Sequence, residues 1–262
     1  MMTRTSHSLN WLLFFLFLTF WGTGCQFSTS GEKDPPRVVT DMLGRKVEIP
    51  QDVDSVIGVG PGALRLLVYM DLADRISGVE DVELRPGRPY ALAHPELTGK
   101  PVIGPYMGGE SELIAMNGPD VIFMAFSTAS DADELQNKSG IPVVGLNSGN
   151  LRNARDTLFH AFQLIGNITG QSGRADSLIN FIEQEIRTLD SLTEAKPIQY
   201  RLSAYIGGIS FRGAHGISST EAFYAPFRFV NVENVAGNLK EKEPVQPTGT
   251  YVDLEQIIQW DP

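Results

Sequence analysis

Cysteine is almost absent from this sequence, because its 262 residues include only one, Cys25. A single cysteine cannot form an intrachain disulfide, and a zinc site built from several thiolates is excluded. Positive charge is also scarce: 21 Lys and Arg residues stand against 31 Asp and Glu residues, which gives a formal net charge of −10. Nucleic-acid binding depends on neutralising phosphates, so a chain this acidic is a poor candidate for it.

Long apolar runs are rare as well, and the most prominent one lies near the N-terminus. Residues 11–21, WLLFFLFLTFW, are apolar except for Thr19, and Arg4 precedes them. A membrane span needs about 20 apolar residues, whereas a secretory signal has an apolar core of about 7–15. Small residues and then Cys25 follow, an arrangement that resembles a bacterial lipobox. We therefore expect residues 1–24 to be a lipoprotein signal peptide and Cys25 to be acylated; the alternative is an ordinary or uncleaved signal with an incidental cysteine.

The segment after Cys25 is polar. Residues 25–36 contain Ser, Gly and Pro and have too few apolar side chains to build a core, which predicts a flexible tether. The remaining chain is then a soluble domain, lipid-anchored outside the cytoplasm on the periplasmic side or at the cell surface. The sequence does not distinguish the inner from the outer membrane.

Short apolar runs alternate with helical patterns over residues 37–150, which we expect to form an N-terminal α/β lobe. Strands are expected at residues 38–40, 45–49, 55–59, 76–79, 102–103, 121–125 and 143–146. Helices are expected at residues 63–70, 111–116 and 131–138, with Ser111 as an N-cap. Apolar strands that alternate with helices predict a parallel sheet covered on both faces.

The pattern changes at residue 151. Residues 151–195 carry two amphipathic helical patterns with a break at residues 166–170, which predicts a helical spine between two lobes. A strand is expected at residues 200–206, and residues 254–262 repeat the pattern of residues 112–120 without the strand that follows there. The fold class is therefore α/β, with two lobes of parallel-sheet α/β units and an apparently truncated second lobe at residues 196–262. The alternative is that a short helix simply ends the chain.

Three segments together resemble a known family. Residues 39–50, 55–59 and 111–122 are similar to the opening hairpin, the first buried strand and the helix-to-strand "E-x-I…P-D-V-I" signature of metal-chelate substrate-binding proteins of ABC importers. Members bind ferric siderophores, haem or cobalamin. The resemblance implies two α/β lobes, a rigid helical linker and a ligand in the cleft between them.

Independently of the family resemblance, a lipid tether and an acidic α/β body favour a solute-binding protein over an enzyme. There is no G-x-S-x-G nucleophile motif, and residues 58–62 do not form a nucleotide-binding loop. We expect capture of an iron complex and its delivery to an ABC permease with its ATPase. A binder of molybdate or tungstate, a surface-anchored hydrolase and a sensor or adhesion lipoprotein remain alternatives.

Ligand-binding groups are expected on loops after strands, where open α/β sheets bind ligands. The candidate loops include residues 60–62, 85–90 and 127–128. The candidate ligand-binding side chains are Arg88, Tyr90 and Tyr106 in the first lobe and Tyr205, Arg212 and His215 in the second. The planar guanidinium of arginine can form two parallel hydrogen bonds to anionic oxygens, and Tyr or His can ligate ferric iron. The alternative is that the glycines near Arg212 only build turns and that Arg212 is a solvated charge.

The resemblance also implies one acidic docking residue per lobe for the permease. These are Glu112 and, through the internal repeat, Glu255, with Glu110 as a rival to Glu112. We expect a monomer that uses no cofactor. No dedicated metal cage is expected either, because the sequence offers no second cysteine and no H-x-x-x-H spacing.

Overall fold

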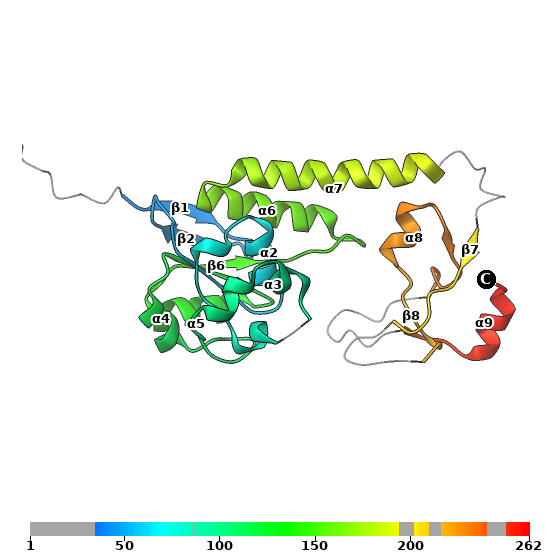
Figure 1. The fold of residues 1–262 in the computed structure, drawn as a ribbon, viewed down its shortest axis with the longest axis horizontal. Coiled ribbons are helices and arrows are strands. Elements are labelled where there is room, and N and C mark those ends of the chain that lie inside the picture. Colours follow the sequence, from blue (N-terminus) through cyan, green and yellow to red (C-terminus); the bar gives the residue numbers. More distant parts are fainter. Residues whose placement is uncertain (1–34, 86, 194–201, 210–215, 240–249) are drawn as a thin grey trace, which may run out of the picture. The chain divides into compact units, whose positions relative to one another are not determined.

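A computed structural model describes residues 35–85, 87–193, 202–209, 216–239 and 250–262 (Figure 1). The chain divides into a short N-terminal unit, Met1–Pro35, and a second unit, Pro36–Pro262, which contains the folded elements described below. The expected signal peptide, Cys25, Arg212 and His215 lie outside the described residues. The structure therefore does not test the predictions that rest on them.

The second unit begins with the expected hairpin. Strand β1 (Arg37–Thr40) pairs antiparallel with β2 (Lys46–Ile49), with Arg37 opposite Ile49. Asp41 closes the turn because one of its carboxylate oxygens accepts backbone N–H groups from Leu43 at 3.0 Å and from Arg45 at 2.8 Å. The alternation of exposed and buried residues along β2 places one face of the hairpin on the core.

Four parallel strands form the main sheet, in the order β4-β3-β5-β6. Their bounds are β3 Val56–Val59, β4 Ile76–Gly78, β5 Val121–Ala125 and β6 Val143–Leu146. Residue 102, expected in a strand, forms an isolated parallel bridge with Val79. Asp120 aligns the start of β5 with β3, because its Oδ2 accepts the backbone N–H groups of Asp54 and Ser55, each at 2.9 Å. These two hydrogen bonds give Asp120, the second residue of the Pro-Asp dipeptide, a structural role.

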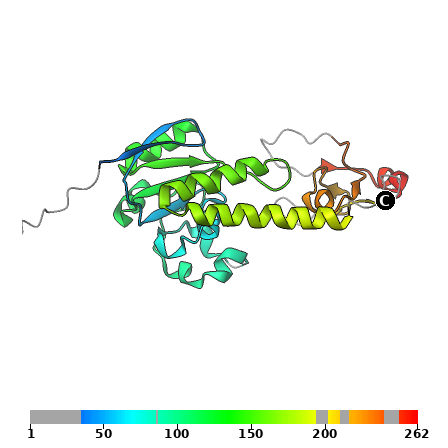
Figure 2. The same ribbon diagram turned by 90° about the horizontal axis from the view of Figure 1, so that it is seen from above.

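Helices cover both faces of this sheet, as expected for parallel strands (Figures 1 and 2). The α-helices of this part are α2 Ala63–Tyr69, α3 Pro89–Ala93, α4 Ser111–Asn117 and α5 Ala129–Ser139. Three short 3₁₀ turns are η1 Ala73–Arg75, η2 Asp81–Leu84 and η3 Pro95–Gly99. Along β5, Phe123 packs into one apolar cluster with α2, while its neighbours Ile122 and Met124 pack into a second cluster with α4 and α5. The strand is buried on both sides, which confirms the α/β class.

The expected N-cap of α4 is wrong. Glu110 holds the N-cap position and Ser111 is already helical, with its hydroxyl donating to the Glu112 carboxylate at 3.0 Å. A side-chain capping box forms instead at α5, where Thr128 and Asp131 bond each other's backbone N–H groups.

The two helices expected over residues 151–195 are present as α6 (Arg155–Thr169) and α7 (Ser172–Thr193). They lie side by side in both views, joined at Gly170, whose φ of 73° ends α6 (Figures 1 and 2). Their burial differs, because α6 buries Phe162 and Ile165 in the core of the sheet whereas α7 buries only Ala175. Within the described part of the chain, none of the helices is both long and apolar enough to cross a membrane.

The C-terminal segment contains shorter elements. Strand β7 (Ser203–Ala204) pairs parallel with β9 (Glu233–Asn234), while β8 (Ser219–Thr220) pairs antiparallel with β10 (Thr250–Tyr251). Helices α8 (Ala225–Phe229) and α9 (Leu254–Trp260) accompany them. The strand expected over residues 200–206 is thus a two-residue strand within the described residues.

Candidate ligand-binding site

Three loops meet at the carboxyl edge of the sheet, after the neighbouring strands β3, β5 and β6. The loop after β3 begins at Gly60, whose φ is 84°. A Cβ at Gly60 would lie 2.3 Å from the carbonyl oxygen of Ala125, the last residue of β5. Only glycine allows this close approach, so the first loop lies tightly against the end of β5.

The loop after β5 begins with an unusual residue. Phe126 has a φ of 56°, a region that bulky side chains rarely occupy, and 73% of its surface is exposed. The next residue, Ser127, has a buried hydroxyl that finds no partner within the described part of the chain. Strained backbone and unsatisfied polar groups concentrate at functional sites, so this loop is a candidate ligand contact.

Glu80 links the first loop to the glycine-rich loop at residues 104–109. Its side chain is buried, with Oε2 accepting the N–H of Gly60 at 3.1 Å and Oε1 accepting the N–H of Gly108 at 3.2 Å. Burial raises the pKa of this carboxyl, although the N–H groups of Gly108, Gly60 and Met107 act in the opposite direction. The two loops are therefore held together by one buried acidic side chain, which sequence reasoning missed.

A second buried acid, Glu83, brings two of the expected ligand-binding residues together. The Arg88 Nε lies 3.3 Å from Glu83 Oε2, and the Tyr90 hydroxyl donates to the same carboxylate oxygen. Burial, together with the bond to Glu83, raises the pKa of Tyr90. Arg88 and Tyr90 are thus adjacent as expected, but Glu83 already engages both.

Tyr106 and Tyr205, the other described candidates, differ in their contacts. The Tyr106 side chain is 43% exposed in the glycine-rich loop, and its hydroxyl bonds to no other described residue. The Tyr205 hydroxyl instead donates to the carbonyl of Ile217 at 2.6 Å, and its ring lies 6.2 Å from that of Trp260 in α9. Burial raises the pKa of Tyr205. Tyr205 is therefore already engaged within the C-terminal segment, and its expected contact with a ligand stays a prediction.

Arg65 in α2 is a further basic group at this edge, and the sequence reasoning did not select it. Its Nε is buried without a partner among the described residues, and its guanidinium lies 6.0 Å from the ring centre of Tyr69. One guanidinium nitrogen is 3.5 Å from the Cβ position of Gly62, and the Ser148 hydroxyl is 3.8 Å from that same point. The available signal was an arginine inside an apolar helix, three residues after a glycine turn.

Acidic and imidazole groups suited to a metal ion do not cluster in the described ranges. Among these residues, no group of three or more His, Cys, Asp or Glu side chains could hold a metal ion. His94 Nδ1 lies 2.8 Å from Glu96 Oε1 near the surface, and His160 is exposed on α6.

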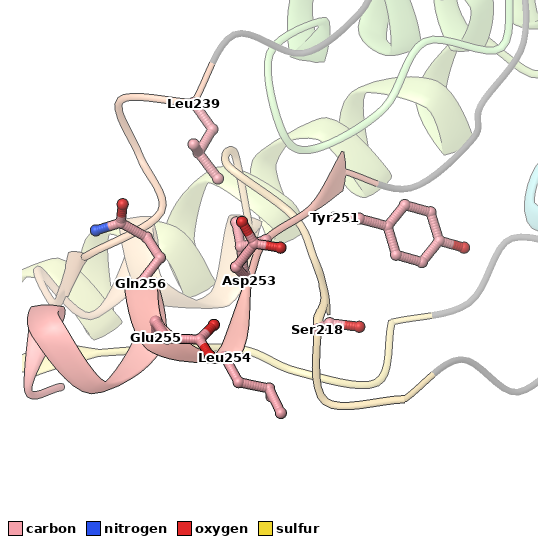
Figure 3. A pocket seen from close by; sticks show the side chains of 8 residues that line it. Ser218, Leu239, Tyr251, Asp253, Leu254, Glu255 and Gln256 are labelled. Atoms are coloured by element: carbon pink, nitrogen blue, oxygen red, sulfur yellow. The ribbon is translucent and has the colours of Figure 1, made fainter.

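Both residues expected to dock on a permease are exposed near the starts of helices. Glu112 lies in the first turn of α4, and hydrogen bonds from its own backbone N–H and from the Ser111 hydroxyl lower its pKa. Glu255 lies in the first turn of α9 and lines an open hollow of about 580 Å³. Figure 3 shows Asp253, Glu255 and Gln256 around this hollow, with Tyr251 on β10 and Ser218 just before β8.

The family follows from a comparison of the sequence with family models. The periplasmic binding protein model matches residues 56–262, so the chain belongs to this family. A curated relative, the molybdate-binding protein MolA of Haemophilus influenzae, is 28% identical over 111 residues. This match covers 42% of the present chain and 32% of the relative, so it spans about a third of the relative's length.

Solved structures share the fold. MolA of Haemophilus influenzae bound to molybdate gives a TM-score of 0.63 at 21% identity, covering 86% of this chain and 72% of that one. The petrobactin-binding protein YclQ of Bacillus subtilis gives a TM-score of 0.63 at 16% identity, and the match covers 87% of this chain and 75% of that one. The catecholate-siderophore-binding protein VctP of Vibrio cholerae gives a TM-score of 0.62 at 15% identity, and the match covers 87% of this chain and 76% of that one. These likenesses establish the architecture and leave the ligand open.

Proposed function

We propose that this protein is the extracytoplasmic substrate-binding component of an ABC importer, which captures a solute and delivers it to a permease and its ATPase. The family match over residues 56–262 is the observation that carries the proposal. The parallel sheet supports it, because open α/β sheets bind ligands at the carboxyl ends of their strands.

The ligand we favour is an iron complex, namely a siderophore, haem or a cobalamin-like metal chelate. YclQ and VctP, which share the fold, are described as binding petrobactin and a catecholate siderophore. The exposed rings of Phe126 and Tyr106 give apolar surface for such a ligand at the edge of the sheet. Arg212 and His215 are proposed to complete the contacts from the second lobe, with Tyr205 nearby in the sequence.

A small oxyanion such as molybdate or tungstate is the second candidate. It is favoured by one specific observation, because MolA matches this chain both in sequence and in fold. The surface-anchored hydrolase gains no support, since no serine hydroxyl bonds a histidine within the described residues.

The proposal includes an anchor and a domain arrangement. A lipid on Cys25 would hold the chain at the membrane through a tether at residues 25–36. Residues 37–150 and 196–262 would form two lobes joined by residues 151–195, and the protein would act as a monomer. Two exposed carboxylates, Glu112 and Glu255, would dock these lobes on the permease.

Native mass spectrometry of full-length protein purified from its source, combined with metal analysis, tests the proposal. A co-purifying iron complex supports the favoured ligand, and bound molybdate or tungstate supports the second candidate. A carrier melts at a higher temperature with its solute and does not consume it. Turnover of ester or phosphate-ester substrates, without any bound solute, would contradict the proposal.

A further inference from the structure

Arg65 is half-buried, and no acidic side chain among the described residues forms an ion pair with it. Its Nε is inaccessible to water and bonds to nothing among the described residues. The buried acids Glu80 and Glu83 are engaged elsewhere: Glu80 accepts the N–H groups of Gly60 and Gly108, and Glu83 pairs with Arg88. A buried N–H donor in a protein is normally hydrogen-bonded, because its desolvation without compensation costs free energy.

The surroundings of Arg65 supply further hydrogen-bond donors. The Ser148 hydroxyl, on the loop after β6, and a guanidinium nitrogen of Arg65 both lie within 4 Å of the Cβ position of Gly62. The unpartnered hydroxyl of Ser127 follows the adjacent strand β5 by two residues. A planar cation and two hydroxyl groups at one sheet edge form a donor set that matches anionic oxygen atoms.

We propose that Arg65, with Ser127 and Ser148, binds an anionic oxygen of the solute. This inference rests on the proposed function and narrows it, because it requires a ligand that presents oxyanion, phenolate or carboxylate oxygens to the first lobe. Arg65 is then a ligand-binding residue that leaves its guanidinium unpaired until the solute arrives. A neutral or cationic solute would leave that group unpaired in the complex.

The same geometry separates a binding role from a structural one. Replacing Arg65 with Gln removes a guanidinium whose buried Nε has no hydrogen-bond partner among the described residues, so the unliganded variant should melt at or near the wild-type temperature. A structural arginine would behave in the opposite way, because its loss would lower that temperature.

Calorimetric titration of the full chain with sodium molybdate and with ferric tris-catecholate tests the proposal. The variants are Arg65→Gln, Arg65→Lys and the control Arg187→Gln, which removes an equal charge from an exposed i,i+4 pair on α7. We expect Arg65→Gln to weaken binding of the preferred probe about ten- to a hundredfold. The affinity of Arg65→Lys should lie between those of the wild type and Arg65→Gln, because lysine keeps the positive charge but lacks the planar guanidinium that can form two parallel hydrogen bonds. The control should bind like the wild type.

Each outcome decides one question. Preference for molybdate identifies a free oxyanion, and preference for the catecholate identifies a chelate. Unchanged binding by Arg65→Gln overturns the role of Arg65 and leaves the proposed function intact. If the wild type binds neither probe, the anionic ligand is overturned, whereas the proposed function falls only if native protein also carries no solute. If Arg65→Gln fails to fold, the test passes to Arg65→Lys. The proposal then stands if Arg65→Lys folds stably and binds the probe more weakly than the wild type, and it is overturned in favour of a structural role if Arg65→Lys also fails to fold or binds like the wild type.

Discussion

Glu112 and Glu255 occupy the same position in two similar helices. Each is the second residue of a seven-residue helix, α4 or α9, that follows an acidic N-cap, Glu110 or Asp253. Each helix ends at a left-handed residue and is followed by proline. The internal repeat therefore pairs Glu112 with Glu255, and Glu110 with Asp253.

This correspondence leads to a prediction about transport. The double variant Glu112→Ala with Glu255→Ala should abolish solute uptake in cells and leave solute affinity unchanged. Exposed ion pairs contribute only about 0.2–1 kcal/mol each, so two of them orient a transient complex without making it permanent. Uptake of labelled solute and calorimetry on the purified variant measure the two effects.

The control for docking is Glu134→Ala, which removes an exposed acid of α5 that pairs with Lys138. This variant should transport normally. Normal uptake by the double variant would exclude a docking role for this pair. If Glu110→Ala alone abolishes uptake, Glu110 is the docking residue of the first lobe.

Asp41 should be essential for stability. Its fully buried carboxylate accepts N–H groups from Leu43, Arg45 and Gly145 and also pairs with the Arg45 guanidinium at 3.1 Å. Loss of one partner from a buried pair costs about 3–5 kcal/mol, so Asp41→Asn should lower the free energy of unfolding by about this much. Urea denaturation measures the change.

Asp133 provides a matched control, because it bonds the same Arg45 at 2.8 Å from a carboxylate whose side chain is 60% exposed. Asp133→Asn should cost no more than about 1 kcal/mol. Equal effects of the two substitutions would contradict the assigned importance of burial.

Glu80 should give the fold a pH dependence. Burial raises its pKa above the ordinary 4.5, so between 4.5 and the raised value the folded chain binds more protons than the unfolded chain. Stability contributed by protonated Glu80 is therefore lost as pH rises through this interval. The free energy of unfolding of the wild type, minus that of Glu80→Gln, should fall as pH rises from 4.5 toward neutrality. A difference that rises or stays constant in urea titrations would refute this.

The strands of the first lobe could be predicted from the sequence because their burial follows local patterns. The five residues of β5 are all buried and all apolar, as a strand between two helical layers requires. The position of α4 was also predictable, but its cap was not. Ser111 suits an N-cap by residue type, yet the chain becomes helical one residue earlier than that role requires.

The candidate site was less predictable, because its key groups depend on contacts between distant residues. Glu80 and Glu83 read as surface acids within a charged stretch, but the Glu80 partners lie 20 and 28 residues away. Arg65 similarly reads as the solvated residue of an amphipathic helix. No local pattern encodes its buried Nε, which has no partner among the described residues, or the position of its guanidinium beside Gly62, where Ser148 of the loop after β6 also lies.

Arg212 should bind the solute from the second lobe. A hydrogen bond to a charged group contributes about 1.5–3 kcal/mol, so Arg212→Ala should weaken binding about ten- to a hundredfold with little change in melting temperature. Calorimetry with the co-purifying solute measures the affinity, and Arg187→Ala serves as the control. Wild-type affinity in Arg212→Ala would remove this residue from the ligand set.

Cys25 should anchor the protein. It is the only cysteine, so it is the only residue that can carry an acyl thioether. Each buried CH₂ of an acyl chain contributes about 0.8 kcal/mol, and several chains together hold a protein stably on a bilayer. Cys25→Ala should therefore move the protein from the membrane to the soluble fraction, as measured by fractionation and immunoblotting. Ser28→Ala, in the same tether, should stay membrane-bound. Retention of Cys25→Ala at the wild-type level would show that the chain is held by something other than a lipid on this cysteine.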